Sequence, residues 1–156
     1  FDADLPNGER YRESDNYAAG MEARVAQTPW GLVGLTICYD LRFPHLYRSL
    51  AKAGSSIIGV PSAFTRSTGR AHWDILIRAR AIETGCFIVA SAQCGRHYGK
   101  RLTHGHSLIV DPTGAILQEA SEDPCFIIAD LDLGLVKTTR TSLPSLQHDR
   151  DYRMSN

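Results

Sequence analysis

The sequence lacks any long hydrophobic run and any excess of charge of one sign. No apolar stretch approaches the ~20 residues that a membrane-spanning helix needs, and no signal peptide is visible. The 17 basic and 17 acidic side chains balance, so the chain has no excess of positive charge of the kind that binds nucleic acid. We therefore expect neither a membrane nor a nucleic acid among its partners.

Cysteine is scarce as well. The four copies, Cys38, Cys86, Cys94 and Cys125, are widely separated in a chain of 156 residues, which is long enough to bury a core. This spacing indicates free thiols in a reducing compartment rather than a disulfide framework, so we expect a cytoplasmic protein. Length and composition predict one domain over residues 1–156, with a polar tail over residues 144–156.

Short apolar runs and apolar stripes at helical spacing predict an α/β fold. Strands are expected over residues 32–38, 56–60, 87–92, 105–110, 115–120 and 126–131. Helices are expected from Pro44 to a cap at Gly54, over residues 72–84 with a cap at Gly85, and over residues 133–141. The alternation of strands and helices in the first half favours a parallel sheet, and a turn at residues 111–114 predicts an antiparallel hairpin. Residues 1–23 are expected to be loop-like.

Cys38 stands where an apolar strand stops and a helix is about to begin. A strand-to-helix turn exposes its central side chain at the end of a sheet, as in the nucleophile elbow of hydrolases. The N-terminus of the following helix favours negative charge, and Arg42 could add to this effect. The main-chain N–H of Tyr39 could point at an oxyanion. A buried cysteine is more often a small hydrophobic side chain, and the other three cysteines keep that interpretation.

The six histidines leave the proton-handling partner of such a thiolate open. They are His45, His72, His97, His104, His106 and His148. His104 and His106 would share a strand face and could bind a metal, but a polar exposed face is favoured because no third ligand is suitably spaced. Residues 95–100 resemble a phosphate-binding loop that is one residue short and is followed by Arg101 rather than Ser or Thr, so we reject it.

The run Gly34-Leu-Thr-Ile-Cys-Tyr-Asp-Leu-Arg-Phe-Pro44 resembles the cysteine signature of the carbon–nitrogen hydrolase (nitrilase) superfamily. Tyr11-Arg-Glu-Ser-Asp15 also resembles a segment of that family. Further segments that resemble it lie at residues 61–64 and 71–83, and those that resemble its deaminated glutathione amidase branch lie at residues 92–97, 105–107, 111–112 and 147–148. The resemblance covers essentially the whole chain.

The resemblance implies an α-β-β-α sandwich and a cysteine amidase that needs no metal and no cofactor. In that family a Glu–Lys–Cys triad acts on a small-molecule amide, ammonia or an amine leaves, and water hydrolyses a thioester. Carried over, the nucleophile falls on Cys38, the supporting carboxylate on Glu13 and the oxyanion N–H on Tyr39. A homodimer or higher homo-oligomer is implied too. An ω-amidase or N-carbamoyl amidohydrolase is the alternative within the superfamily.

The resemblance also implies a substrate pocket. Its residues would be Ser62, Ala63, Phe64, His72 and Trp73. Of these, His72 and Trp73 could equally pack in the core at the start of a helix. Arg42 could bind a substrate carboxylate, although pairing with Asp40 is the favoured interpretation. For Glu13 the alternative is a solvated loop carboxylate.

The chain departs from the family in one respect. The general-base Glu and the catalytic Lys of the family would both precede Phe1, and none of the lysines of this chain, Lys52, Lys100 and Lys137, stands at the matching place. We therefore expect a C-terminal portion of a hydrolase that is inactive alone and needs the N-terminal segment of the same protein as its partner. The alternatives are a non-catalytic fragment or pseudoenzyme that acts by association, and a cysteine–histidine hydrolase complete within 156 residues.

Overall fold

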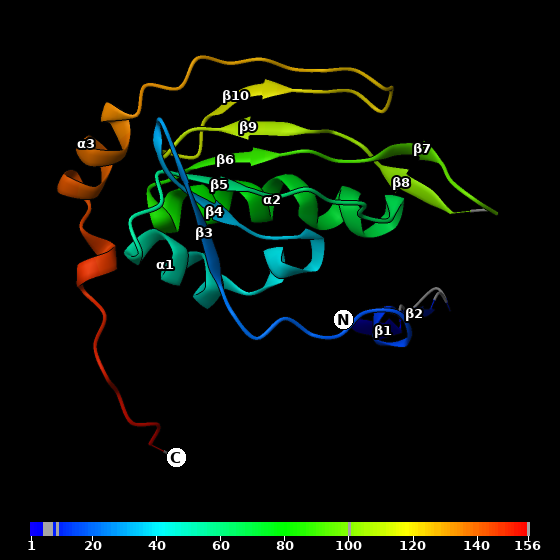
Figure 1. The fold of residues 1–156 in the computed structure, drawn as a ribbon, viewed down its shortest axis with the longest axis horizontal. Coiled ribbons are helices and arrows are strands. Elements are labelled where there is room, and N and C mark those ends of the chain that lie inside the picture. Colours follow the sequence, from blue (N-terminus) through cyan, green and yellow to red (C-terminus); the bar gives the residue numbers. More distant parts are fainter. Residues whose placement is uncertain (5–7, 9, 100, 156) are drawn as a thin grey trace.

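A computed structural model describes residues 1–4, 8, 10–99 and 101–155. Its centre is a six-stranded sheet in the order β10-β9-β6-β5-β4-β3 (Figure 1). The strands are β3 (Arg24–Thr28), β4 (Gly31–Leu35), β5 (Ile57–Gly59), β6 (Phe87–Ala90), β9 (Leu108–Val110) and β10 (Ile116–Glu119). Strands β4, β5 and β6 are parallel, and the outer pairs are antiparallel. The expected α/β class is confirmed.

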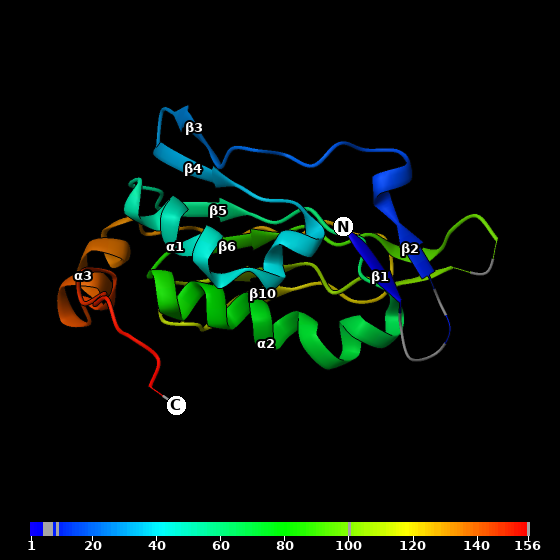
Figure 2. The same ribbon diagram turned by 90° about the horizontal axis from the view of Figure 1, so that it is seen from below.

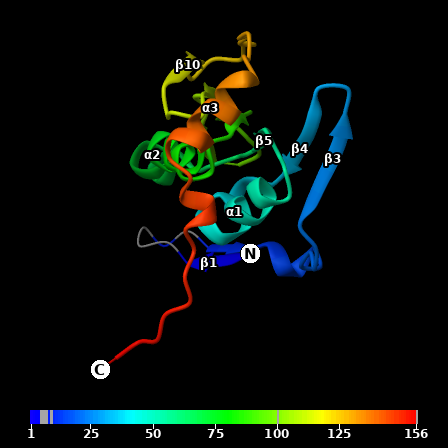
Figure 3. The same cartoon turned by 90° about the vertical axis from the view of Figure 1, so that its left-hand side faces the viewer.

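Helices α1 (Pro44–Lys52) and α2 (Arg66–Thr84) connect the parallel strands and lie together on one face of the sheet (Figure 2). Helix α3 (Gly134–Ser142) lies at one end of the sheet, and the tail runs away from the body beyond it (Figure 3). Three short 3-10 helices complete the fold: η1 (Glu13–Asp15), η2 (Cys38–Arg42) and η3 (Ser145–Gln147). None of the helices in the described ranges has the length and apolar character of a membrane span.

The core lies between the sheet and its two helices. Ile58, Ile88 and Val110 stand in register on adjacent strands and are fully buried. In the same row lies Gly34, where an added Cβ would sit 3.2 Å from Leu50 of α1. Because burial of a large apolar side chain contributes about 1.5–3 kcal/mol, this row fixes how the helices sit on the sheet.

Helix α2 also packs on a small hairpin formed by β7 (Cys94–Arg96) and β8 (Leu102–His104). The approach is closest at Gly69, where an added Cβ would overlap the Cβ and Cγ atoms of His104. These atoms lie near the backbone of β8 and cannot swing aside as the end of a long side chain could.

Replacing Gly69 by alanine is therefore expected to lower the free energy of unfolding by about 1–2 kcal/mol. Alanine gains about 1 kcal/mol in helix propensity, but overpacking costs up to about 3 kcal/mol. Urea denaturation measures the difference. The control is Gly20→Ala, whose Cβ would meet nothing within 4 Å and which should stabilise the chain by less than about 1 kcal/mol. A Gly69→Ala protein as stable as the parent would show that α2 and β8 can separate at little cost.

Several expected elements are confirmed. Gly85 ends α2 in the left-handed conformation (φ 58°), and its N–H donates to the carbonyl of Ala81. The hairpin predicted around residues 111–114 joins β9 to β10. Its turn is held by Asp111, whose carboxylate accepts N–H bonds from Thr113 (2.8 Å) and Ala115 (3.0 Å).

Other expectations about the elements are wrong. The first 23 residues are not simply a loop, because β1 (Asp2–Asp4) and β2 (Arg10–Arg12) form an antiparallel pair. Strand β4 ends at Leu35 rather than at residue 38, since the chain turns there toward η2. Helix α2 begins six residues before the expected start, because Thr65 caps it by accepting the N–H of Thr68 (3.3 Å).

The strand expected over residues 126–131 is absent from the described part of the chain. The segment is extended there, with Phe126 and Ile128 85% and 74% exposed, but it pairs with no described strand. A short apolar run shows that a segment could form a strand, whereas the neighbour that would bind its backbone cannot be read from the run.

Candidate active site

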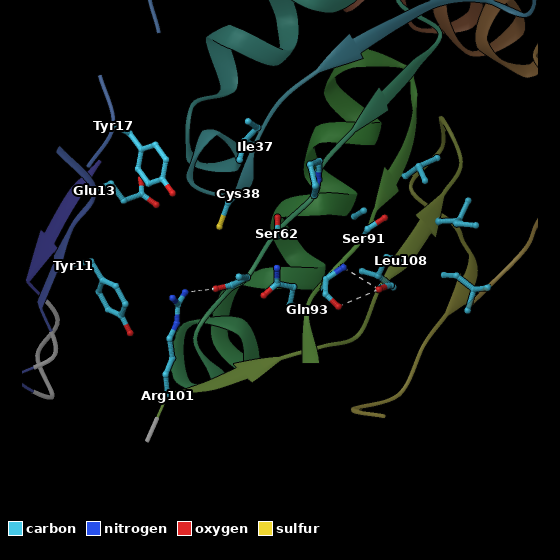
Figure 4. A pocket seen from close by; sticks show the side chains of 18 of the residues that line it. Tyr11, Glu13, Tyr17, Ile37, Cys38, Ser62, Ser91, Gln93, Arg101 and Leu108 are labelled. Carbon is cyan, nitrogen blue, oxygen red and sulfur yellow. Dashed lines mark hydrogen bonds between the residues drawn. The ribbon is translucent and has the colours of Figure 1, made fainter. Parts of the chain in front are cut away.

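The carboxyl ends of β4, β5 and β6 meet at one edge of the sheet, the usual place of a site in a parallel sheet. Cys38 follows β4, residues 61–63 follow β5 and residues 91–93 follow β6, and all of them line one cavity of about 1060 Å³. Figure 4 shows Cys38 pointing into this cavity, with Glu13 and Tyr11 across from the strand ends. We call it the Cys38 cavity.

Cys38 has a backbone φ of 45°, in the left-handed region that residues other than glycine rarely adopt. The turn is fastened on both sides of the thiol. The N–H of Cys38 donates to the carbonyl of Pro61 (2.9 Å), and the N–H of Ile37 donates to the carboxylate of Asp40 (2.8 Å). Strained backbone that the surroundings hold in place is typical of functional sites, and here it turns the cysteine out of the sheet.

Arg80, a residue of α2, supports the same turn. It is 5% exposed, and its Nε donates to the carbonyl of Leu41 (3.0 Å) within η2. Its Nη1 donates to the carboxylate of Glu83 (2.9 Å), whose pKa is raised by burial and lowered in part by this arginine. The guanidinium also lies over the ring of Tyr47. A buried cation of α2 therefore fixes the segment that carries the thiol.

Glu13 lies in η1, on the opposite side of the Cys38 cavity from the strand ends. Its backbone N–H donates to the carbonyl of Phe1 (3.4 Å). The Phe1 ring stacks on Tyr39 with centroids 4.7 Å apart. The segment that bears Glu13 is thus tied to the turn that bears Cys38.

Only some of the expected pocket residues line the cavity. Ser62 and Ala63 do, together with Cys38 and Glu13. Phe64 and Trp73 are buried instead, with their rings 5.1 Å apart, and the Trp73 Nε1 donates to the carbonyl of His106 (2.6 Å). For Trp73 the structure therefore favours the core interpretation.

Arg42, His72 and the side chain of Tyr39 lie outside the lining of the cavity. Arg42 and His72 contact each other, with Nη1 and Nδ1 3.3 Å apart, and the guanidinium lies over the rings of Tyr39 and Phe64. The expected pairing of Arg42 with Asp40 is wrong for the described residues, because Asp40 instead caps the N–H of Ile37. The Tyr39 amide directly follows the thiol in sequence.

The other cysteines differ in burial. Cys86 is fully buried, its thiol pKa is raised by that burial, and it accepts a bond from the Arg140 Nη2 (2.9 Å). Cys94 is half-buried in β7. Cys125 is exposed and lines the Cys38 cavity, so its interpretation as a core residue is wrong. All four thiols are free.

The histidines and lysines do not complete a catalytic set in the described part of the chain. The rings of His104 and His106 stack (centroids 4.5 Å apart), yet no three potential metal ligands converge among the described residues. Burial lowers the pKa of His104. Lys52 pairs with Asp149 and Lys137 lies on α3, so neither lines the Cys38 cavity, and Lys100 falls outside the described residues.

The sequence reasoning missed several residues that line the cavity. Among them are Tyr11, Gln93, Arg101 and Cys125. A signal existed for Gln93, because a polar residue shortly after a buried strand marks the carboxyl edge of a parallel sheet. Arg101 and Cys125 reach the cavity from distant segments, and spacing along the chain gives no sign of that.

Known proteins resemble this chain in both sequence and structure. The profile of the carbon-nitrogen hydrolase family matches residues 1–141. A deaminated glutathione amidase of Synechocystis is 46% identical over 150 residues, which are 95% of this chain and 55% of that protein. The NitFhit protein of C. elegans has 46% identity and a TM-score of 0.89, over 96% of this chain and 37% of that one.

A further solved structure shows an active-site cysteine that has reacted covalently. It is a mutant amidase from Nesterenkonia sp. AN1 with the acetamide moiety of fluoroacetamide bound covalently to its active-site cysteine. It is 27% identical, with a TM-score of 0.74, and the match covers 88% of this chain and 49% of that one. The chain spans about half the length of the curated relatives it matches. By the extent of the family match and these identities, this chain belongs to the carbon-nitrogen hydrolase family.

Proposed function

We propose that the protein carrying this chain hydrolyses the C–N bond of a linear carboxamide through a thioester on Cys38. The observation that carries the proposal is the strained, outward-turned Cys38 at the carboxyl edge of the parallel strands. The Cys38 Sγ attacks the amide carbon, and the N–H of Tyr39 stabilises the oxyanion. The amide nitrogen takes up the proton that the thiol has lost and leaves as ammonia when the C–N bond breaks, and water then cleaves the thioester to a carboxylic acid and the free thiol.

The substrate that we propose resembles deaminated glutathione. The support is the name of the relatives, which share 46–47% identity with this chain. An ω-amidase or N-carbamoyl amidohydrolase activity is the alternative within the superfamily. The substrates share a small amide group, and they differ in what the rest of the molecule presents to the cavity.

We further propose that residues 1–156 alone do not turn over amides. The family resemblance puts a general-base Glu and a catalytic Lys outside this chain, and no described lysine lines the Cys38 cavity. Losing one oxyanion donor costs about a hundredfold or more in rate, and losing a base adds to that loss.

The test compares two proteins, residues 1–156 alone and the protein as its gene encodes it. Ammonia release is measured from a panel of small amides that includes deaminated glutathione. We expect turnover in the second protein and none above background in the first. No turnover in either would argue for a non-catalytic protein that acts by association. Turnover by residues 1–156 alone would mean that a histidine of this chain serves as the base.

A further inference from the structure

The Cys38 cavity carries more positive than negative side chains. Its charged residues are Arg10, Arg12, Arg101 and Glu13. The carboxylate of Asp4 binds Arg12 through both oxygens (2.8 and 3.0 Å) and lies 3.6 Å from the Nε of Arg10. Among the described residues, Arg101 has no carboxylate partner. It is therefore the cavity cation that no described carboxylate pairs with, whereas Arg10 and Arg12 share Asp4.

Arg101 is held in place by two contacts. It directly precedes β8, and its Nη2 donates to the carbonyl of Ala63 (3.1 Å) in the loop after β5. Its guanidinium lies over the ring of Tyr11, 5.6 Å from the centroid. Figure 4 shows the guanidinium reaching between Tyr11 and the strand ends, within the space that Cys38 also faces. The side chain is thus oriented before any ligand arrives.

The hydrogen-bonding capacity of Arg101 exceeds what these contacts use. A guanidinium has five N–H donors in a planar fork that matches a carboxylate, and the single bond to Ala63 occupies one of them. Stacking on a ring leaves the in-plane donors of the fork available. A purely structural clamp on the Ala63 loop would not need a cation without a counterion at the wall of a cavity.

We propose that Arg101 binds a carboxylate of the substrate and thereby selects amides that carry a negative charge remote from the scissile bond. This inference rests on the proposed amidase function and deepens it by naming the class of substrate. Arg101 is then a specificity-determining residue, and the chemistry at Cys38 does not depend on it. Arg42, which the sequence suggested for this role, lies outside the lining of the cavity.

The experiment uses the protein as its gene encodes it and two amides of equal chain length, glutaramate with a carboxylate and pentanamide without one. We expect Arg101→Gln to lower kcat/KM for glutaramate by about 10–100-fold, mainly through KM, because a hydrogen bond to a charged group is lost. Pentanamide hydrolysis should change by less than about twofold, since Arg101 is not in contact with an uncharged tail in this proposal.

Arg101→Lys should restore part of the loss. Arg96→Gln, on the same hairpin but outside the lining of the cavity, is the matched control and should behave as the parent.

Two results would overturn the proposal. An equal loss on both amides would make Arg101 a support of the Ala63 loop, and an unchanged KM for glutaramate would remove it from recognition. Should the parent protein hydrolyse no amide at all, the proposed function fails, and recognition is then decided by calorimetric titration with glutarate. Glutarate binding that Arg101→Gln weakens about tenfold or more would support the carboxylate site even then, whereas equal or absent binding would refute it.

Discussion

Replacing Cys38 by alanine is expected to reduce amide hydrolysis by at least about a thousandfold, to the background of the assay. The thiol forms the bond to the substrate carbon in the proposed mechanism, and losing a nucleophile removes most of an enzyme's rate enhancement. Alanine leaves the backbone bond from residue 38 to Pro61 in place, so the protein should stay folded. Ammonia release by the protein as its gene encodes it measures the effect.

Cys125 offers a demanding control, because it is an exposed thiol that lines the same cavity. Cys125→Ser should keep full turnover. Fluoroacetamide, whose acetamide moiety adds to the active-site cysteine of a mutant Nesterenkonia amidase, should label residue 38 in the parent and in Cys125→Ser but not in Cys38→Ala. Label on Cys125 or Cys94, or turnover that survives in Cys38→Ala, would contradict the assignment of the nucleophile.

Replacing Glu13 by glutamine is expected to lower kcat by about a hundredfold, within the usual range for a carboxylate that handles protons. Glutamine keeps the size of the side chain, but it can neither carry a negative charge nor hold a proton in transfer. Glu13 lines the Cys38 cavity, and the ring of Phe1, which directly precedes β1, stacks on Tyr39 beside the thiol, so we expect the charge of Glu13 to act on the site. Steady-state ammonia release gives kcat.

The matched control for Glu13 is Asp15→Asn. Asp15 belongs to the same 3-10 helix but does not line the cavity. Both variants should unfold within about 0.5 kcal/mol of the parent, as surface substitutions usually do. Parental kinetics in Glu13→Gln would return this residue to the class of solvated loop carboxylates, and equal losses in both variants would point to a general charge effect.

The sequence predicts the central strands and the helix ends of this fold better than the start of α2 and the segment at residues 126–131. Continuous apolar runs in β5 and β6, with Pro44, Gly54 and Gly85 at the helix ends, are local signals that each element carries within itself. The expected start of α2 is six residues late because the first turns of the helix carry no apolar stripe, and the signal there is the cap by Thr65. Residues 126–131 failed as a strand because pairing depends on a neighbour that this segment does not encode.

Some residues of the candidate site could likewise be predicted from the sequence, and others could not. Cys38 could be found from its place between a strand and a helix, and Glu13 only from the family resemblance. The sequence leaves Trp73 open between the pocket and the core, and its indole is buried against Phe64, since the direction of a side chain on a helix depends on the register of that helix. Arg101 reaches the cavity through the β7–β8 hairpin, whose pairing with the rest of the site is a long-range property of the fold.

The left-handed backbone at Cys38 bears on how such a protein could be engineered. A residue other than glycine held at φ 45° costs about 1–3 kcal/mol, a sizeable share of the 5–15 kcal/mol by which a typical domain is stable. Glycine adopts this conformation freely, so a laboratory selection for heat resistance alone would reward the loss of the thiol at this position. Directed evolution of this protein would therefore have to score turnover and thermal tolerance in the same round.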